Sequence, residues 1–424
     1  MPKKMKTKKA VTNPKGIIES FFNNLESIRV FVGNVEPVAS AFDIETSKKM
    51  DAIKSEIKEI ISSGKTSNKI EIPKEALEQA VEGLVVILRD FRKLPRITIG
   101  QLELLYKSSF VMLISFFDYL LYDIIHCYYK LFPESLSEEL SINLIELKLC
   151  ADCDEAIDVI LDRKVDSILR DSLKEQKLFF KKIEIDLKER IINWDIISEA
   201  IECRNIVVHN NSIVNKRYLR NVDLLVIPEK GKAIKEGEKL GITTEYFKRA
   251  YDEILIAGVV IIQSCWRKWM KDDLENADTS LINSILELLL REEWSVAEKI
   301  GLFSKDIKVS NAASRYVLNI NYCQSLKWQG KKAELNKELD RFDESNLSPR
   351  FRVAMSALKS DKDAFYKHIE KAIAIEELAE EDFRHWPLFR ELRQDDEYAG
   401  RVKKAFSKKS KVVKKASLPP PQPL

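Results

Sequence analysis

The chain has 424 residues, 45% hydrophobic and 32% charged, which is enough apolar content to bury a core and excludes a wholly disordered protein. Lysine plus arginine number 70 against 67 acidic residues, and the net charge of +3 neither requires nor excludes a nucleic-acid partner. Six cysteines are too sparse for a disulfide scaffold. The length predicts two or three domains.

The N-terminus and the longest apolar run bear on where the protein is located. No apolar segment of the kind that a signal peptide needs follows the N-terminal Met-Pro-Lys-Lys. The longest apolar run, Ile254 to Ile262, is too short to cross a bilayer. We therefore expect a reduced, soluble, cytoplasmic protein without a membrane partner.

The N-terminal region divides into a basic arm and a helical extension. Residues 1–15 are rich in lysine and predict a disordered arm, and residues 16–70 predict an extension with apolar positions at helical spacing. Gly33 and Pro37 interrupt that spacing, so a second helix is expected over about 45–62. Ser63-Gly64-Lys65-Thr66 lacks the upstream glycine of a phosphate-binding loop, because Glu59 stands there, and predicts an ordinary loop.

Several helices are predicted over residues 73–190. Pro73 opens one that ends near Leu94, and apolar residues at three- and four-residue steps predict the longest helix over 98–131. Two or three further helices with charged faces are expected over 138–190. His126 is expected to be a structural histidine, and Cys150 and Cys153 form a single CxxC without the second pair that a zinc site needs.

The most specific chemistry lies at Arg204-Asn205-Ile206-Val207-Val208-His209, on a helix predicted over about 195–209. Arginine is a permanent cation suited to phosphate, and histidine exchanges protons near neutral pH. Residues five apart lie about 140° apart around an ideal helix. Asn210-Asn211 is a plausible helix end, because Asn tolerates left-handed backbone, and it would leave His209 in the last turn. The buried side is predicted to include Ile206, Val207 and Val208.

This segment resembles the HEPN family, whose motif is an arginine, a polar residue, three further residues and a histidine on a late helix of an all-α domain. The downstream run to Tyr218-Leu219 is similar to the branch found in prokaryotic defence and toxin proteins. The resemblance implies a homodimer in which two motifs face each other and form one metal-independent RNase site, without a cofactor or metal. His209 would be the general base, Arg204 would stabilise the charged phosphate, and Asn205 would orient the phosphate or the partner motif.

The resemblance also suggests auxiliary residues. The helix that pairs with the motif helix often carries an acidic residue aimed at the site, and Asp118 is the candidate, with a solvated or capping carboxylate as the alternative. Further RNA-contacting candidates are Asn210, Lys216, Arg217 and Tyr218. A purely structural alternative remains for the motif, in which Arg204 binds a carboxylate and His209 caps the helix C-terminus.

Beyond the motif, a short strand is expected at Leu224–Ile227 as part of a minor β-hairpin, followed by a helix that Thr243 or Thr244 caps and that ends near Met270. The Trp266-Arg267-Lys268-Trp269 segment could stack on bases, but closure of a hydrophobic core is the favoured interpretation.

Short helices are expected from residue 272 onward. Ser325, Lys331 and Ala333 recur as Ser356, Lys362 and Ala364, each 31 residues later. This resembles a degenerate tetratricopeptide repeat, a class that binds protein partners, with plain helical packing as the alternative. The chain ends in lysines and prolines, a composition typical of disorder.

These observations predict an all-α protein with an HEPN-like helical bundle, a minor β-hairpin and a helical-repeat-like C-terminal domain. The predicted parts are a disordered arm (1–15), an N-terminal helical extension (16–70), the HEPN-like domain (71–271), a tetratricopeptide-like domain (272–406) and a disordered tail (407–424). The expected function is an RNA-cleaving enzyme in phage defence or growth control. The alternative is a non-catalytic dimerisation or nucleotide-binding protein whose C-terminal helices bind another protein.

Overall fold

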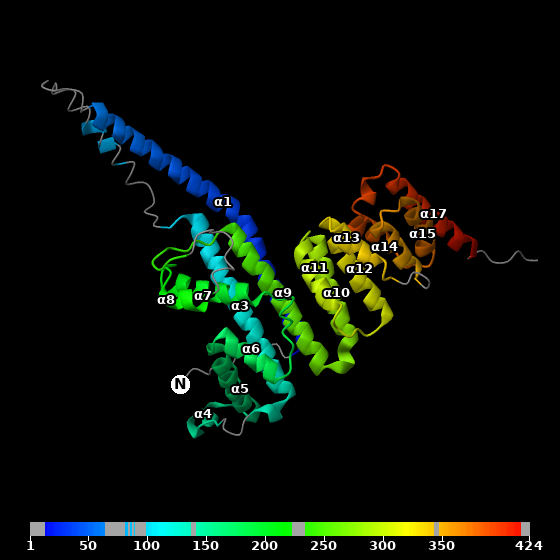
Figure 1. Ribbon diagram of the computed structural model, residues 1–424, viewed down its shortest axis with the longest axis horizontal. Coiled ribbons are helices and arrows are strands. Elements are labelled where there is room, and N and C mark those ends of the chain that lie inside the picture. Colours follow the sequence, from blue (N-terminus) through cyan, green and yellow to red (C-terminus); the bar gives the residue numbers. More distant parts are fainter. Residues whose placement is uncertain are drawn as a thin grey trace, which may run out of the picture. The chain divides into compact units, whose positions relative to one another are not determined.

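The structure is a computed structural model that describes residues 13–63, 81–83, 85–86, 89, 99–136, 141–222, 234–342 and 347–416. Among these residues every extended regular element is a helix, which confirms the all-α class. The longer helices are α1 (Pro14–Ser63), α3 (Gln101–Leu131), α5 (Cys153–Arg170), α6 (Leu173–Lys182), α7 (Trp194–His209), α9 (Thr244–Trp269), α10 (Leu274–Leu290), α11 (Trp294–Ser304), α12 (Ala312–Trp328), α13 (Lys332–Leu339), α14 (Pro349–Leu358), α15 (Lys362–Ala374) and α17 (Tyr398–Ala416) (Figure 1). The shorter ones are α4 (Leu144–Leu149), α8 (Lys216–Asn221), α16 (Glu380–His385) and the 3-10 turns η1 (Pro133–Ser135), η4 (Lys271–Asp273), η5 (Pro387–Phe389) and η6 (Leu392–Gln394).

One short antiparallel pairing accompanies the helices. An isolated bridge joins Ile213 to Lys239, and the Val214 N–H donates to the Glu238 carbonyl at 2.8 Å. The strand expected at Leu224–Ile227 lies outside the described residues, so the β-hairpin stays a prediction. The loop at Gly64 and most of the helix expected over 73–94 also lie outside them.

Helix α1 corrects the expected break near Gly33 and Pro37. It runs continuously from Pro14 to Ser63, with Pro37 inside it, and includes the segment expected as a second helix. Proline removes one backbone hydrogen bond and crowds the carbonyl four residues earlier, which here belongs to Gly33. Both residues are exposed, so water can solvate the released carbonyl, while Val32 and Ala39 are buried on either side of the break. The stabilisation from burying the periodic apolar residues of α1 therefore exceeds the cost of the hydrogen bond lost at Pro37.

A carboxylate from α1 caps α3. Asp43 accepts hydrogen bonds from the backbone N–H groups of Gln101 and Leu102 at 2.8 and 2.9 Å. These donors are among those that a helix N-terminus leaves without an intrahelical acceptor. A Cβ on Gly100 would lie 2.9 Å from the Asp43 Oδ2, so a larger residue at this position would displace the capping carboxylate. This contact defines the start of the helix that the sequence predicts over 98–131.

Helix α3 has the length and composition of a membrane span, with a mean hydropathy of 1.6 in its most apolar window. Ile254–Ile262 is the longest uninterrupted apolar run, whereas α3 reaches its high mean hydropathy although polar residues interrupt it. Within the protein, 56% of it is buried, as in the core helix of a folded domain.

The chain forms two compact units, each made of separate segments. One comprises residues 19–123 and 193–255, and so contains most of α1, the first part of α3, α7, α8 and the first part of α9. The other comprises residues 1–18, 124–192 and 256–424. Residues 71–271, which the sequence analysis assigned to one domain, contribute to both units.

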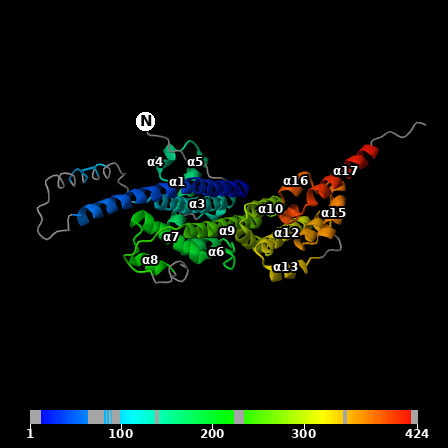
Figure 2. The same ribbon diagram turned by 90° about the horizontal axis from the view of Figure 1, so that it is seen from above.

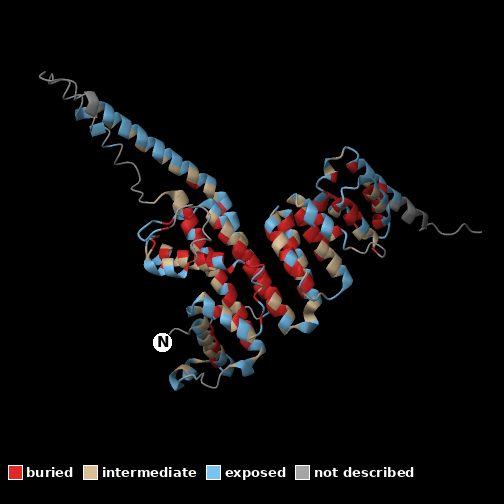
Figure 3. Ribbon diagram, viewed as in Figure 1, coloured by how far each residue is buried: buried red, intermediate tan, exposed pale blue. Residues whose placement is uncertain are grey.

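Aromatic packing joins α3 to α9 in the first unit. Phe110 lies 5.5 Å from Tyr246 and Tyr106 lies 5.6 Å from Phe247, measured between ring centroids. Buried residues follow one another along the middle of α9 (Figure 3). The Thr243 hydroxyl accepts from the Tyr246 N–H at 3.1 Å, which confirms the predicted N-cap of α9.

In the second unit the helices from α10 to α15 pack in chain order as three hairpins, α10–α11, α12–α13 and α14–α15 (Figure 2). Each hairpin has the same three-residue turn, whose middle residue has left-handed backbone: Glu292 (φ 61°), Gly330 (φ 72°) and Ser360 (φ 55°). In each turn the next N–H donates five residues back, from Glu293 to Leu288, from Lys331 to Leu326 and from Asp361 to Ser356. These are Schellman closures.

The repeat in the structure differs from the repeat expected from the sequence. Trp328 and Leu358 end equivalent helices, 30 residues apart, whereas the matching serines, lysines and alanines are offset by 31. Only one of the three left-handed turn positions is glycine, so the sequence does not show a repeated glycine from which the turns could be predicted. The likeness to tetratricopeptide repeats stays a prediction. Helix α17 continues to Ala416, ten residues beyond the position at which the sequence analysis ended the helical domain.

Candidate functional site

Helix α7, which carries the Arg204–His209 motif, spans Trp194–His209, within one residue of the prediction. The Asn193 side chain accepts from the Ile196 N–H at 3.3 Å and starts the helix. At the other end Asn210 is the C-cap, and Asn211 has left-handed backbone with φ 49°. The helix therefore ends where the paired asparagines predicted, with His209 as its last residue.

A buried carboxylate anchors α7 to α8 and α9. Glu199 is 3% exposed and accepts hydrogen bonds from the hydroxyls of Tyr218 at 2.6 Å and Tyr246 at 2.5 Å. Burial and the neighbouring carboxylate raise the pKa of Tyr218, so this hydroxyl keeps its proton and acts as a donor. The network fixes the rotation of α7, and with it the direction in which the motif faces.

Tyr218 is therefore a correction. The sequence analysis placed it among the RNA-contacting residues, but it is fully buried, with an exposure of 0%. Its N–H also donates to the Asn215 side chain, which caps α8. Tyr218 stabilises α7 through its hydrogen bond to Glu199 and presents no surface to RNA.

Arg204 and Asp118 form an ion pair in the first unit. The Arg204 Nη2 lies 3.1 Å from the Asp118 Oδ2, and their side chains are 25% and 41% exposed. Partial burial raises the pKa of the Asp118 carboxyl above its ordinary value, and the Arg204 charge offsets part of that rise. The Arg204 Nε is buried without a hydrogen-bond acceptor among the described residues. The guanidinium thus has donor capacity left beyond the contact with Asp118.

His209 is exposed at the end of α7, and Asn205 is half-buried one position after Arg204. The burial expected for the next positions was partly wrong, because Val208 is 50% exposed and Val207 is only half-buried, while Ile206 is 4% exposed. The reason is geometric: three consecutive residues of a helix cannot all face one core. The exposed end of α7 is therefore more apolar than the pattern suggested.

The other auxiliary candidates have different surroundings. Asn210 donates its side-chain N–H to the Ile213 carbonyl at 2.6 Å, so it shapes the turn after α7. Lys216 and Arg217 are exposed in the first turn of α8, where they can contact a ligand.

Several residues noted in the sequence lie in the core or carry no metal site. Cys150 and Cys153 are free thiols, and the described residues contain no group of three or more His, Cys, Asp and Glu side chains placed to hold a metal ion. His126 is buried, with its pKa lowered by that burial. Trp266 is 2% exposed, and the Trp269 ring lies 5.6 Å from that of Tyr128, so these tryptophans close a core as favoured.

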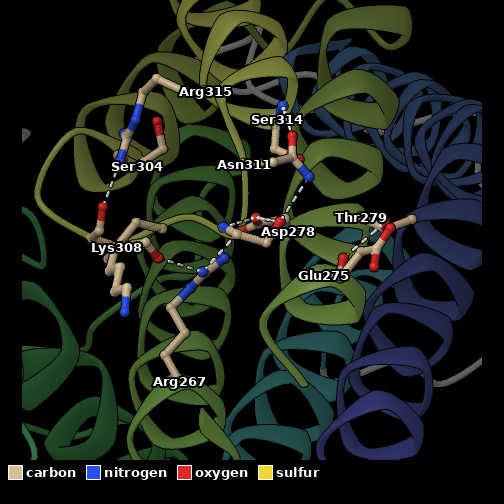
Figure 4. A network of polar contacts seen from close by, with 11 residues as sticks. Arg267, Glu275, Asp278, Thr279, Ser304, Lys308, Asn311, Ser314 and Arg315 are labelled. Carbon is tan, nitrogen blue, oxygen red and sulfur yellow. Dashed lines mark hydrogen bonds and ion pairs between the residues drawn. The ribbon is translucent and has the colours of Figure 1, made fainter. Parts of the chain in front are cut away.

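The sequence did not indicate which acids are buried, and Glu199 and Asp278 are two of them. Glu199 occupies the apolar stripe of α7 between Ile196 and Cys203, and a charged residue at such a position was the available signal. Asp278 is completely buried in α10, where it accepts from Arg267 and Ser310 (Figure 4). No pattern in the sequence pairs Asp278 with residues 11 and 32 positions away.

Comparison of the chain with models of known protein families, with curated proteins and with solved structures gives no match in any of the three.

Proposed function

We propose that the chain is a metal-independent endoribonuclease of the HEPN type, acting in the cytoplasm in phage defence or toxin-like growth control. The observation that carries the proposal is that α7 carries both an exposed His209 and an Arg204 whose guanidinium, within the described part of the chain, forms an ion pair with Asp118 alone. A proton acceptor and a positioned cation are the groups that ribose-directed RNA cleavage requires.

In the proposed reaction, His209 removes the proton of a ribose 2′-hydroxyl. The 2′-oxygen then attacks the adjacent phosphorus, the bond to the 5′-oxygen breaks, and a second protonated imidazole returns a proton to that oxygen. Arg204 stabilises the negative charge that develops on the phosphate, and Asn205 orients the phosphate or the partner motif. The products carry a 2′,3′-cyclic phosphate and a 5′-hydroxyl.

Asp118 supports this arrangement as a positioning residue. It holds one arm of Arg204 at 3.1 Å, while the Nε has no acceptor in the described part of the chain. A carboxylate that is itself 41% exposed can give up its partner to a phosphate at lower cost than a fully buried one. Lys216 and Arg217, both exposed on α8, extend the cationic surface toward RNA.

The second imidazole requires a second copy of the chain, in keeping with the expected homodimer. Leu104, Met112 and Tyr119 are 46%, 44% and 46% exposed and are spaced by eight and seven residues, which places them on one face of α3. Tyr119 directly follows Asp118. A twofold contact along this face would bring two Arg204–Asp118 pairs close together, since such a contact joins identical surfaces.

A second candidate belongs to the class of binding proteins. Here the α7 site is not catalytic and serves dimerisation or nucleotide binding, and the helical hairpins bind a protein partner. The three repeated turns from α10 to α15 favour this candidate, because stacked hairpins form extended surfaces for other proteins. In the first proposal the same hairpins sense a trigger or restrain the nuclease.

Cleavage of a labelled single-stranded RNA in excess EDTA tests the two candidates. His209→Ala and Arg204→Ala are each expected to lower the cleavage rate by about 100-fold or more. Their unfolding free energy should change by no more than about 0.5 kcal/mol for the exposed histidine, and slightly more for the half-buried arginine. The cleaved 3′ fragments should carry 5′-hydroxyls that polynucleotide kinase can phosphorylate.

Matched controls separate the site from the rest of the surface. His385→Ala removes an exposed histidine that pairs with Glu381 on α16, and Arg291→Ala removes an arginine that pairs with Glu287. Both should cleave like the wild type. Wild-type cleavage by a well-folded His209→Ala would favour the binding-protein candidate, and activity that disappears in EDTA and returns with Mg²⁺ would refute the proposed mechanism.

A further inference from the structure

A pocket of about 500 Å³ lies in the second unit, and none of its lining residues belongs to the Arg204–His209 motif. Its walls come from the segment after α6, from the last turns of α9, from η4 and the start of α10, and from the loop between α11 and α12. The volume lies within the range of pockets that hold small ligands.

Ion pairs and hydrogen bonds hold these walls together. Glu184 pairs with Lys268 at 2.5 Å, and Arg190 pairs with Asp306. The Arg267 Nη1 donates to the Lys308 carbonyl at 2.9 Å and to the Asp278 Oδ1 at 2.7 Å (Figure 4). The pocket is therefore built by contacts between segments far apart in sequence, and does not depend on a single loop.

Arg267 is an unusual lining residue because its side chain is only 8% exposed. Its Nη1 is satisfied, but its Nε and Nη2 are buried without an acceptor among the described residues. The Ser264 hydroxyl, one turn earlier on α9 and also in the lining, is buried without a partner there as well. Buried donors without acceptors are costly, so an acceptor supplied by a ligand would be stabilising.

The charge of the lining is strongly positive. It contains five cationic side chains and two carboxylates, a difference of three positive charges: Lys188, Arg267, Lys268, Lys271 and Lys308 against Glu184 and Asp186. The two carboxylates pair with Lys268 and Lys188. No carboxylate of the described residues lies within ion-pair distance of Lys271 or Lys308, so these two amines are available to an anion.

Burial, together with the nearby charge of Arg315, lowers the pKa of Arg267. Both effects disfavour the charged guanidinium, and an anion in the pocket would relieve them.

We infer that this pocket binds a nucleoside monophosphate, with the phosphate held by Lys271, Lys308 and the Arg267 guanidinium. Ile185, Leu274 and Ile307 supply the apolar part of the lining against which a planar base packs. The pocket volume accommodates a nucleotide, whereas a bare inorganic anion would leave the apolar walls uncovered. This binding site is independent of the nuclease proposed for α7, and its test does not use cleavage.

Isothermal titration calorimetry of the full chain with AMP, GMP, CMP and UMP tests the inference. At least one of the four is expected to bind saturably, at least about tenfold more tightly than its nucleoside and than inorganic phosphate. Lys271→Glu and Lys308→Glu should each weaken that binding at least about tenfold, since each reverses a charge at the phosphate. These lysines are exposed, so the variants should fold even where an Arg267 variant does not.

Lys332→Glu is the control, because Lys332 is also exposed and opens α13 as Lys271 opens η4. It should bind the nucleotide like the wild type. The inference is overturned if none of the four monophosphates binds, if the nucleoside binds as tightly as its monophosphate, or if Lys271→Glu and Lys308→Glu bind like Lys332→Glu. Equal binding of inorganic phosphate would likewise overturn it, because the apolar walls would then contribute nothing.

Discussion

Two arginine–aspartate ion pairs, one in each unit, have the same chemical groups but differ in how far they are buried. Arg204 and Asp118 meet at 3.1 Å with side chains 25% and 41% exposed. Arg267 and Asp278 meet at 2.7 Å with side chains 8% and 1% exposed. The first pair lies near the exposed end of α7, and the second lies inside a network that ties α9 and α10 to the loop between α11 and α12 (Figure 4).

The number of partners separates the two pairs further. Asp278 accepts from Arg267 and from both the backbone N–H and the hydroxyl of Ser310, at 2.7 and 2.6 Å for the latter two. Among the residues that the structure describes, Asp118 has one such contact, with Arg204. A buried carboxylate whose two oxygens are both hydrogen-bonded cannot exchange partners without leaving a charge unpaired in the interior, whereas a half-exposed one can. The Arg204–Asp118 pair is therefore suited to binding a ligand, and the Asp278 network stabilises the fold.

The largest expected effect is on stability. Asp278→Ala should lower the unfolding free energy by about 3–5 kcal/mol, because it leaves the buried Arg267 charge uncompensated and the Ser310 donors unpaired. Asp118→Ala should cost no more than about 1 kcal/mol, since its pair is partly solvated. Urea denaturation followed by circular dichroism measures both. Equal losses of unfolding free energy in the two variants would show that the two ion pairs contribute equally to stability.

The next effect is on activity. Arg204→Lys should lower RNA cleavage by about 100-fold, close to 2.7 kcal/mol in the barrier, because an ammonium cannot make the two-pronged contact of a guanidinium with phosphate. Its unfolding free energy should stay within about 1 kcal/mol of the wild type, since an ammonium can still pair with Asp118. Rate and stability are measured on the same preparation. A variant that cleaves normally would show that Arg204 only holds Asp118.

The smallest effect is a pH dependence that differs in sign between two aspartates. The folded state raises the pKa of Asp118, so this carboxyl favours folding most at low pH, and its contribution is lost as pH rises through the raised value. Asp118→Asn does not titrate there, and its stability relative to the wild type should therefore increase between about pH 3 and pH 6. The measurement is the unfolding free energy of both proteins across that range.

Asp395 is the control of opposite sign. A hydrogen bond from Lys362 lowers the pKa of the Asp395 carboxyl, so its stabilising contribution is present at higher pH and is lost as pH falls. The stability of Asp395→Asn relative to the wild type should therefore decrease as pH rises. The same sign for both aspartates would contradict the difference in their surroundings.

Much of the local structure was predictable from the sequence. The bounds of α7, α3 and α9 came from apolar spacing and from capping residues such as Thr243 and the paired asparagines at 210 and 211, all of which act within a few positions of one another. Arg204 and His209 were selected from their residue types and from the resemblance to the HEPN family, and their role in a site stays a prediction. Helix-forming and helix-ending interactions are short in range, so the chain itself encodes them.

Which residues cover which faces depends on how distant segments pack against one another. Asp118 and Arg204 are 86 positions apart. The family resemblance suggested only that Asp118 is aimed at the site, and their ion pair was not predicted. Tyr218, expected at the surface, is buried against Glu199, and α1 runs through Pro37 because other positions of that helix are buried. Periodicity shows that a helix has an apolar face, but burial, ion pairing and the direction of a side chain depend on the segment that packs against that face, and that segment is distant in sequence.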